Sequence, residues 1–486
     1  MKSMTARLIA HAVLGEVVAG PSQQAFTAIT TDSRKPAPGA LFVALAGPRF
    51  DGHTFVRDAL NLGAAGALVD ARHIDAEGRL TGPLADLPPA AIIAVTDTQR
   101  ALEDLGRAIR LRHSGLFIAV TGSVGKTTIK DMLTAALAPF GPVASTPGNL
   151  NNRIGLPLTL AQTTGDEDHV VLELGMSAAG EIAHLATIAR PDVAIVCAAA
   201  AAHLANFDSV DAIADAKCEL FEHLHPDTIS VANADDPRVI ARARHIIGDQ
   251  LITWGKAPSS TVQVMGARHV RRAEGPRLEV TLAIEEDALT LDLQTLGAHN
   301  ASNAAAALAV VYALGLDVGA AAQALSDNFR APKGRLQTHT AGLVTVIDDS
   351  YNANPASMNA AFDCIAALHA DLAESPRLVL VLGTMHELGP ESTSMHEAIS
   401  RRAAALSPAL VIATGPEATA LVSALPVGCG MTVADLETAL PDLLASCAKA
   451  TGPTLVLIKG SRAERLERAL VPILSAATAP HLEGGA

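Results

Sequence analysis

Short apolar runs, separated by turn residues and amphipathic stretches, recur along the whole chain. In its first quarter the runs at residues 41–45, 67–69 and 91–95 predict strands. An amphipathic stretch at 54–62, between the first two runs, predicts a helix, and the Pro- and Gly-rich residues 80–89 are typical of a loop. The pattern indicates a small α/β domain at the N-terminus.

Beyond about residue 113, apolar strands alternate with helical stretches. Residues 116–121 predict a buried strand, followed by a glycine-rich turn and a helix at 127–137. Further apolar runs lie at 170–174 and 193–197, each bounded by turn residues. This alternation predicts a parallel sheet with crossover helices.

The alternation changes near residues 262–296, where apolar positions follow a period of two. That period predicts an antiparallel hairpin set, and its members are Leu278, Val280, Leu282 and Ile284. An alanine-rich stretch at 301–314 then predicts a long helix, stopped by Gly315.

The last third of the chain repeats the strand–helix unit. Strands are predicted at residues 343–347, 378–382, 410–413 and 455–458, each followed by a helical stretch. Pro355 stands where a first-turn proline belongs, and apolar residues follow it at helical spacing: Met358, Ala361, Phe362, Ile365 and Leu368. No internal repeat of about 20–50 residues is present.

Composition narrows the classes of protein. A chain of 486 residues is too long for one hydrophobic core. Its formal net charge of −14 comes without a basic stripe, so no nucleic acid is expected as a partner. The scattered cysteines contain no CxxC pair, which disfavours a disulfide framework and a zinc site: Cys197, Cys218, Cys364, Cys429 and Cys447.

Targeting signals are weak. The apolar residues at 8–18 are interrupted by His11 and Glu16 and match a signal peptide poorly. The longest apolar run, residues 193–202, is too short to span a bilayer. We therefore expect a cytoplasmic protein without a membrane span, and a monomer.

The strongest chemical signal is the glycine-rich turn after residue 121. Its glycines let successive N–H groups face a phosphate, and the following helix adds the positive end of its dipole. Lys126 is expected to reach the β- and γ-phosphates, and the Thr127 hydroxyl to hold Mg²⁺. Val120 stands where the general pattern has a glycine, so the turn is a shortened variant, and an ordinary glycine-rich turn is the alternative. The expected ATP-binding residues here are Gly122, Ser123, Val124, Gly125, Lys126, Thr127 and Thr128.

Other polar residues admit two interpretations. Glu173 ends the next apolar strand, where a hard carboxylate ligand could reach Mg²⁺. Lys217 lies on a helical stretch, where a lone lysine is usually solvated, and His203 is typical of a helix-start histidine that bonds the backbone. Asn300 and Asn303, near the start of the alanine-rich helix, are candidate helix caps. Lys459 is read most simply as a strand-end lysine.

Taken in order, the loop and six further segments resemble the Mur ligase family, which builds the peptide stem of the bacterial cell wall. The segments are 151–157, 173–176, 201–204, 214–217, 297–303 and 348–355. The resemblance spans nearly the whole chain. It implies an ATP-dependent ligase that activates a carboxylate as an acyl phosphate and joins it to an amine.

The resemblance also implies an architecture of three α/β domains. They are a small N-terminal α/β domain at 1–112 that binds the uridine-diphosphate substrate, a central P-loop parallel-sheet domain at 113–331, and a C-terminal Rossmann-like domain at 332–486 that closes over ATP and binds the incoming dipeptide.

Metal ligands and catalytic residues follow from the same resemblance. It implies two Mg²⁺ ions, with Thr127, Glu173, His203 and Lys217 as ligands. Lys217 takes this role if it is carbamylated, a reaction that needs a neutral amine and is favoured by partial burial. The residues implied to be catalytic are Lys126, His203, Lys217 and Arg335.

Further contacts are implied around ATP and the incoming amine. Asn300, with Asn303, resembles the adenine-contacting motif, and Arg335, after a predicted hinge at 330–334, resembles the phosphate-contacting arginine. Asp349 belongs to a loop that closes over ATP. The residues implied on the dipeptide side are Tyr351, Asn352, Asn354 and Lys459.

Segments 31–34, 39–45 and 50–53 resemble a uridine-diphosphate-binding domain. With segment 151–157, they imply substrate contacts from Ser33, Arg34, Phe50, Asp51, Asn151 and Asn152. Segment 382–389 is similar to the branch of the family that adds a terminal dipeptide, although Thr384 stands where that branch has Asp.

The implied substrates are therefore ATP, UDP-N-acetylmuramoyl-tripeptide and D-alanyl-D-alanine. The branch that adds the third residue is an alternative, although its Asp-Asn-Pro-Arg motif is absent. A P-loop ATPase switch is the alternative from another class. The sequence does not indicate which diamino acid is third in the tripeptide.

Overall fold

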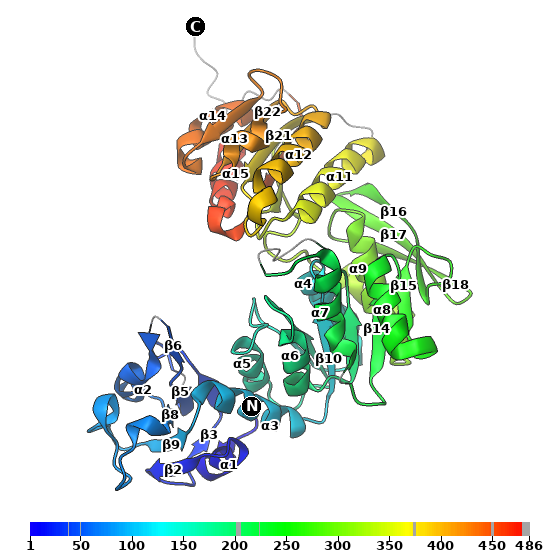
Figure 1. Cartoon of the computed structure of the whole chain (residues 1–486). Helices are drawn as coiled ribbons and strands as arrows, with labels where there is room; N and C mark the ends of the chain where they lie inside the picture. Colours follow the sequence, from blue (N-terminus) through cyan, green and yellow to red (C-terminus); the bar gives the residue numbers. More distant parts are fainter. Residues whose placement is uncertain are drawn as a thin grey trace. The chain divides into compact units, whose positions relative to one another are not determined.

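A computed structural model describes residues 1–36, 38–48, 50–200, 206–222, 224–372, 376–448 and 452–478. Contacts divide the chain into two compact units (Figure 1). The first comprises Met1–Thr121, Phe140–Ile195 and Glu219–Ser230, and the second comprises Gly122–Pro139, Val196–Cys218 and Val231–Ala486.

The first unit begins with a five-stranded sheet in the order β2-β9-β8-β5-β4. Its inner strands β9 (Ala91–Val95), β8 (Gly66–Asp70) and β5 (Ala40–Val43) pair in parallel, and they confirm the three predicted strands. The predicted helix is also present, as a 3-10 turn at Gly52–Phe55 that runs into α2 (Val56–Asn61). Buried residues of α2 and of the three strands form the core of this region.

Several N-terminal elements were not predicted, among them α1 (Ala6–Ala12) and the strands β2 (Glu16–Ala19) and β4 (Ala28–Thr30). The two strands form the edges of the sheet and are only half-buried, so neither carries a continuous apolar run. Edge strands depend on a partner that local sequence does not reveal.

A second group of strands in the first unit lies in the order β11-β12-β10-β13, with β11 at Val143–Ser145 and β13 at Val193–Val196. β10 (Leu116–Thr121) pairs in parallel with β12 (His169–Glu173), and Val120 is opposite Glu173. Helix α3 (Thr98–Leu111) packs on α5 (Gly155–Gln162) and α6 (Glu181–Ala189). The register places Glu173 level with the end of the strand that leads into the glycine-rich turn.

The second unit opens with α4 (Lys126–Leu137), which starts at the glycine-rich turn. Its first strands follow the order β14-β15-β16-β17-β18, with β14 at Ile229–Asn233. The predicted antiparallel set is confirmed as β16 (Val262–Arg272), β17 (Gly275–Ile284) and β18 (Asp287–Leu293). Helix α9 (His299–Ala313) packs on both α4 and β16, so it brings its first turns to the glycine-rich turn.

The C-terminal part of the second unit is a six-stranded sheet in the order β19-β20-β24-β21-β22-β23, and β23 (Gly430–Val433) forms one edge. Its four central strands match the predicted ones: β20 (Val344–Asp349), β24 (Thr454–Lys459), β21 (Arg377–Gly383) and β22 (Leu410–Thr414). These four pair in parallel, and β19 (Gln337–Ala341) runs antiparallel at one edge.

Helices cover both faces of this sheet (Figure 1). One core joins it to α11 (Pro355–Leu372), α12 (Ser392–Ala405) and α13 (Ala418–Val422), and the other joins it to α14 (Leu436–Ala448) and α15 (Leu470–Thr478). The α/β fold class predicted from the sequence is confirmed. Within the described ranges, no helix is long and apolar enough to cross a membrane. The domain boundaries at residues 112 and 331 stay predictions.

Candidate active site

The glycine-rich turn between β10 and α4 is shaped by close contacts at two glycines. Gly125 precedes α4 with φ +86°, a left-handed conformation that favours glycine. A methyl group there would lie 3.0 Å from Oδ1 of Asn303, and one at Gly122 would lie 2.8 Å from Cβ of Cys197. The turn is therefore packed tightly against α9 and the end of β13 (Val193–Val196).

The polar groups of the turn are ordered by the backbone around them. The Ser123 amide donates to the Ala198 carbonyl at 2.7 Å, and the Ser123 hydroxyl donates to the Ala200 carbonyl at 3.2 Å. The Lys126 ammonium donates to the carbonyl oxygens of Gly122 and Ser123, so its charge lies over the turn itself. Val124 lies within the turn, and Thr128 is buried in the first turn of α4. This arrangement fits the expected phosphate cradle.

Arg335 reaches the same turn from the segment before β19. Its Nη2 donates to the Thr127 hydroxyl at 3.1 Å, and its guanidinium lies 4.4 Å from the centre of the Tyr351 ring. The Tyr351 amide donates to the Gly334 carbonyl at 3.0 Å. Two cationic side chains, Lys126 and Arg335, thus converge on one glycine-rich turn.

Asn300 and Asn303 form one hydrogen-bonded pair on α9. Asn303 Nδ2 donates to Asn300 Oδ1 at 2.8 Å, and Asn300 Nδ2 donates to the Leu296 carbonyl at 2.7 Å. The interpretation of Asn300 as a helix cap is wrong, because its amide is buried and Ala298 holds the cap position without a side-chain bond. Asn303 Oδ1 instead faces the turn at Gly125.

Next to Asn303, Ser302 accepts a 3.1 Å hydrogen bond from the indole of Trp254 on β15 (Ile252–Gly255). Trp254 is 1% exposed. The helix that carries the expected adenine-contacting residues is therefore bonded to a buried aromatic residue, Trp254, for which the sequence predicts no role.

Lys217, on α7 (Val210–Glu222), is 3% exposed, so its interpretation as a solvated surface lysine is wrong. Burial, followed by the charge of Lys126, lowers the pKa of Lys217 from its ordinary 10.5 to about 7. A large neutral fraction near neutral pH is what carbamate formation requires. The structure therefore fits the chemistry that the resemblance implies at this lysine.

In the first unit, Glu173 lies at the end of β12 and is 3% exposed. Asn151 Nδ2 donates to Glu173 Oε1 at 2.8 Å, and the Glu173 amide donates to the Thr146 hydroxyl at 3.0 Å. A buried carboxylate held in this way suits a hard cation such as Mg²⁺. Thr146 was not predicted, because it lies 27 residues from Glu173 and no local pattern marks it.

Asn151 and Asn152 were both expected to contact the uridine-diphosphate substrate. Asn151 is turned toward Glu173, whereas Asn152 Oδ1 accepts from the amides of Ile154 at 3.2 Å and Gly155 at 2.8 Å. Asn152 thereby orders the start of α5. A role for either residue in substrate binding stays a prediction.

The remaining residues expected to bind uridine diphosphate lie on the N-terminal sheet region. Arg34 binds Asp32 through Nε and Nη2, both at 2.8 Å, and these bonds lower the pKa of Asp32. Ser33 lies in the turn between them, and Phe50 is 59% exposed. An exposed aromatic ring can stack on a base, but the assignment of these residues to the substrate stays a prediction.

Asp51 lies beside a pair of histidines. Asp51 Oδ1 faces His53 Nδ1, and Arg72 donates to Asp51 Oδ2 at 2.9 Å. His53 Nε2 accepts from the Asp70 amide at 2.9 Å. Both ring nitrogens of His53 therefore have hydrogen-bond partners within the fold.

In the C-terminal part of the second unit, Lys459 and Asp349 meet at the ends of neighbouring strands. Lys459 Nζ lies 2.6 Å from Asp349 Oδ2 and donates to the Asn352 carbonyl at 3.2 Å. Asn354 Oδ1 accepts from the Ser357 amide at 2.8 Å and so caps α11. Each expected dipeptide-side residue therefore has a partner within the fold, Tyr351 through Gly334 and Arg335 and the others as described here.

Thr384 also receives a structural account. Its hydroxyl donates to the Thr414 carbonyl at 3.1 Å and accepts from the Glu417 amide at 3.3 Å. Thr384 thus joins the ends of β21 and β22. His203 lies outside the described residues, so its implied roles stay predictions.

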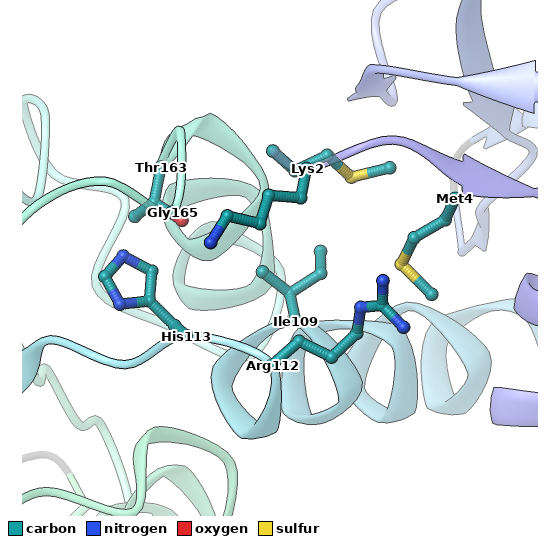
Figure 2. A pocket seen from close by; sticks show the side chains of 8 residues that line it. Lys2, Met4, Ile109, Arg112, His113, Thr163 and Gly165 are labelled. Atoms are coloured by element: carbon teal, nitrogen blue, oxygen red, sulfur yellow. The ribbon is translucent and has the colours of Figure 1, made fainter.

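A pocket in the first unit lies where none of the predicted site residues reaches. Figure 2 shows the Lys2 side chain extending toward Gly165 and His113, while Ile109 and Arg112 lie below it. Close by, His113 Nε2 lies 3.0 Å from Glu167 Oε2. Burial opposes ionisation of Glu167, but hydrogen bonds from Thr164, His113 and Gly165 prevail and lower the pKa of Glu167 to about 2.

A strand that enters a glycine-rich turn, a helix that begins at the turn, and two cations at the turn define a P-loop nucleotide-binding enzyme. Three family models match the chain in order. The Mur ligase family catalytic domain matches residues 25–110, the Mur ligase middle domain matches 120–311, and the glutamate ligase domain of Mur ligases matches 334–462. The chain belongs to the Mur ligase family, and it is an ATP-dependent ligase that forms an amide bond.

Individual relatives resemble most of the chain. The UDP-N-acetylmuramoyl-tripeptide–D-alanyl-D-alanine ligase of Escherichia coli (strain K12) is 37% identical over 442 residues, covering 90% of this chain and 92% of that enzyme. The enzyme of the same name from Bacillus subtilis (strain 168) is 35% identical and covers 82% of each chain. A crystal structure of MurF from Acinetobacter baumannii matches with a TM-score of 0.86, at 30% identity over 98% of this chain and 99% of that one.

Proposed function

We propose that this ligase joins D-alanyl-D-alanine to UDP-N-acetylmuramoyl-tripeptide in the synthesis of peptidoglycan precursors. The observation that carries the proposal is the match, over 90% of the chain, to a relative named for this reaction. The glycine-rich turn with Lys126 and Arg335 supplies the nucleotide site that such a reaction needs.

The first chemical step is transfer of the γ-phosphoryl group of ATP to the carboxylate of the tripeptide. The bond between the β,γ-bridging oxygen and the γ-phosphorus breaks, a carboxylate oxygen bonds that phosphorus, and ADP leaves. Two anions must approach each other, so positive charge at the turn is required. Lys126 and Arg335 meet this need, because both ammonium and guanidinium groups lie at the turn that holds the phosphates.

The second step forms the amide. The dipeptide amine attacks the carbonyl carbon of the acyl phosphate, the carbon–oxygen bond to phosphate breaks, and the amine loses a proton. Each turnover therefore releases one phosphate and consumes one dipeptide. This coupling separates the proposed ligase from an ATPase that merely switches a partner.

We propose Mg²⁺ as the metal, with Thr127, Glu173, His203 and a carbamylated Lys217 as its ligands. Bound Mg²⁺ supplies charge neutralisation at the phosphates. The donor chemistry fits, because Glu173 offers a buried carboxylate and the lowered pKa of Lys217 favours conversion of its amine to a carbamate. We propose that two Mg²⁺ ions bind, as the family resemblance implies.

The remaining assignments are also proposals. Ser33, Arg34, Phe50 and Asp51 are assigned to the uridine-diphosphate end of the substrate, and Tyr351 to the dipeptide side. We propose that the enzyme is a monomer and that it acts in the cytoplasm. The described free cysteines support that compartment, since disulfides are rare there.

Phosphate release with the purified chain tests the proposal. ATP, Mg²⁺ and UDP-N-acetylmuramoyl-tripeptide are supplied with D-alanyl-D-alanine, with a diamino acid, or without an amine. Release only with the dipeptide, matched by an equal amount of ligated product, is expected. Release with the diamino acid and UDP-N-acetylmuramoyl-dipeptide would assign the chain to the third-residue branch, and release without any amine would indicate an ATPase.

A further inference from the structure

Lys459 is one of the largest fully buried side chains described in this protein. It ends β24 and is 1% exposed. Burial of an unpaired ammonium is costly, so a lysine at this depth needs an anionic partner. Asp349 provides it at 2.6 Å, from the position directly opposite Lys459 in the β20–β24 ladder.

The other carboxylate oxygen of Asp349 binds the backbone of the segment before β19. Asp349 Oδ1 accepts a hydrogen bond from the Leu336 amide at 3.2 Å. Leu336 has φ +52°, in the left-handed region that residues other than glycine rarely adopt. A conformation of this kind persists only where its surroundings hold it. The carboxylate of Asp349, held by its contact with Lys459, is such a support.

A second hydrogen bond fixes Gly334, the residue that precedes Arg335 in the chain. The Tyr351 amide donates to the Gly334 carbonyl at 3.0 Å, and a methyl group at Gly334 would lie 2.9 Å from Tyr351 N. Arg335 is therefore held between two residues that are both bonded to the end of β20. From there its guanidinium lies over the Tyr351 ring and donates to the Thr127 hydroxyl at 3.1 Å.

We infer that Lys459 is a positioning residue for the phosphoryl-transfer step, acting through Asp349 and the backbone at Leu336 to place Arg335 at the glycine-rich turn. The sequence had assigned Lys459 to the dipeptide side. Its amine is instead enclosed by Asp349 and the Asn352 carbonyl. The inference rests on the proposed function for the reaction that it serves.

The test compares steady-state kinetics of Lys459→Met, Arg335→Ala and the double variant. Lys459→Met is expected to lower kcat/KM for ATP about tenfold or more, while the KM for D-alanyl-D-alanine stays within about twofold. If Lys459 acts through Arg335, adding Lys459→Met to Arg335→Ala should cost less than about twofold further. Lys256→Ala, at an exposed lysine of the same unit, is the matched control and should behave as the unmodified enzyme.

Three outcomes would overturn the inference. A raised KM for the dipeptide with normal use of ATP would make Lys459 a dipeptide contact. Effects that multiply in the double variant would separate Lys459 from Arg335. A lower unfolding temperature with unchanged kinetics would show a merely structural role. If Lys459→Met fails to fold, Lys459→Arg replaces it, because it keeps the charge but changes the shape of the group against Asp349; the same selective loss for ATP is then expected.

Calorimetry separates a failure of this inference from a failure of the proposed function. An unmodified enzyme that released no phosphate with D-alanyl-D-alanine would refute the proposed reaction. Binding of a non-hydrolysable ATP analogue would still test Lys459, since misplacement of Arg335 should weaken that binding. Equal affinity in the unmodified enzyme and Lys459→Met would refute the positioning role.

Discussion

The side-chain amide of Asn151 donates a 2.8 Å hydrogen bond to Oε1 of Glu173. The contact orients a carboxylate that is 3% exposed, and the Asn151 carbonyl also accepts from the Gly175 amide at 2.8 Å. Asn151 therefore holds both the side chain of Glu173 and the backbone that follows it.

Removal of this side-chain amide should weaken the binding of Mg²⁺. Asn151→Ala is expected to lower the apparent affinity for Mg²⁺ by about 10- to 100-fold, because partners behind a ligand fix its orientation. Titration of activity with Mg²⁺ at saturating ATP measures the effect. Asn149→Ala, at an exposed asparagine of the same loop, is the control. Equal Mg²⁺ dependence in both variants would exclude this role for Asn151.

Lys126→Ala should abolish turnover. The ammonium lies over the carbonyl groups of the glycine-rich turn, and we propose that it binds the terminal phosphates of ATP there. We expect kcat to fall by about a thousandfold or more, in the range of losses seen when a charge that stabilises a transition state is removed. Dipeptide-dependent phosphate release measures it, with Lys256→Ala for comparison. Near-normal ligation by Lys126→Ala would contradict the nucleotide site.

Carbamylation of Lys217 should depend on pH. Its pKa is lowered to about 7, so the amine is mainly protonated below that pH and mainly neutral above it. Reaction of the neutral amine with CO₂ gives a carbamate and a proton, so the modified fraction should rise as pH increases through about 7. Carbon NMR with labelled bicarbonate follows the signal, and Lys217→Arg should lack it.

Chemical rescue tests the function of that carbamate. Lys217→Ala should be inactive and should recover part of its activity with added acetate or propionate, since a small carboxylate replaces the missing metal-binding group. Lys217→Leu, which leaves no space for the added anion, serves as the control. Absence of rescue in Lys217→Ala would argue against a carbamate at this site.

Glu167→Gln should reduce the stability of the fold more at neutral pH than in acid. The pKa of Glu167 in the folded protein is about 2, below its ordinary value of 4.5. The ionised carboxylate therefore stabilises the fold above about pH 4.5, and this contribution disappears as pH falls toward 2. We expect a loss of about 1 kcal/mol at pH 7, since water screens part of the interaction.

Thermal unfolding at pH 7 and pH 3 measures the Glu167 effect. The difference between the unmodified protein and Glu167→Gln should narrow at the lower pH. Glu16→Gln, at an exposed glutamate of the same unit, should change little at either pH. A difference of equal size at both values would disprove the assigned pKa shift.

Strands buried on both faces were the most predictable part of the fold. The expected strands at 91–95 and 116–121 coincide with β9 and β10, because continuous apolar runs between turn residues have few other structures available. By contrast, β19 has the sequence Gln-Thr-His-Thr-Ala and no apolar run. It is a strand because β20 pairs with it, and that long-range contact has no local signal.

The site was predictable at the level of residue type and less so at the level of contacts. Spacing within the turn marked Lys126 and Thr127, because the chemistry of phosphate binding is local. The burial of Lys217 could not be predicted from the sequence, because it depends on which residues pack over α7. Nor did the sequence show that Asp349 and Lys459, 110 residues apart, form one buried pair.

Trp254 gives the protein a practical property. It is the single tryptophan in the chain, and its indole N–H is bonded to Ser302, between the two asparagines expected to meet adenine. Its fluorescence is therefore free of background from other indoles and originates one hydrogen bond away from α9. We propose that this fluorescence changes when nucleotides or competing inhibitors bind, so that binding can be followed without an attached dye.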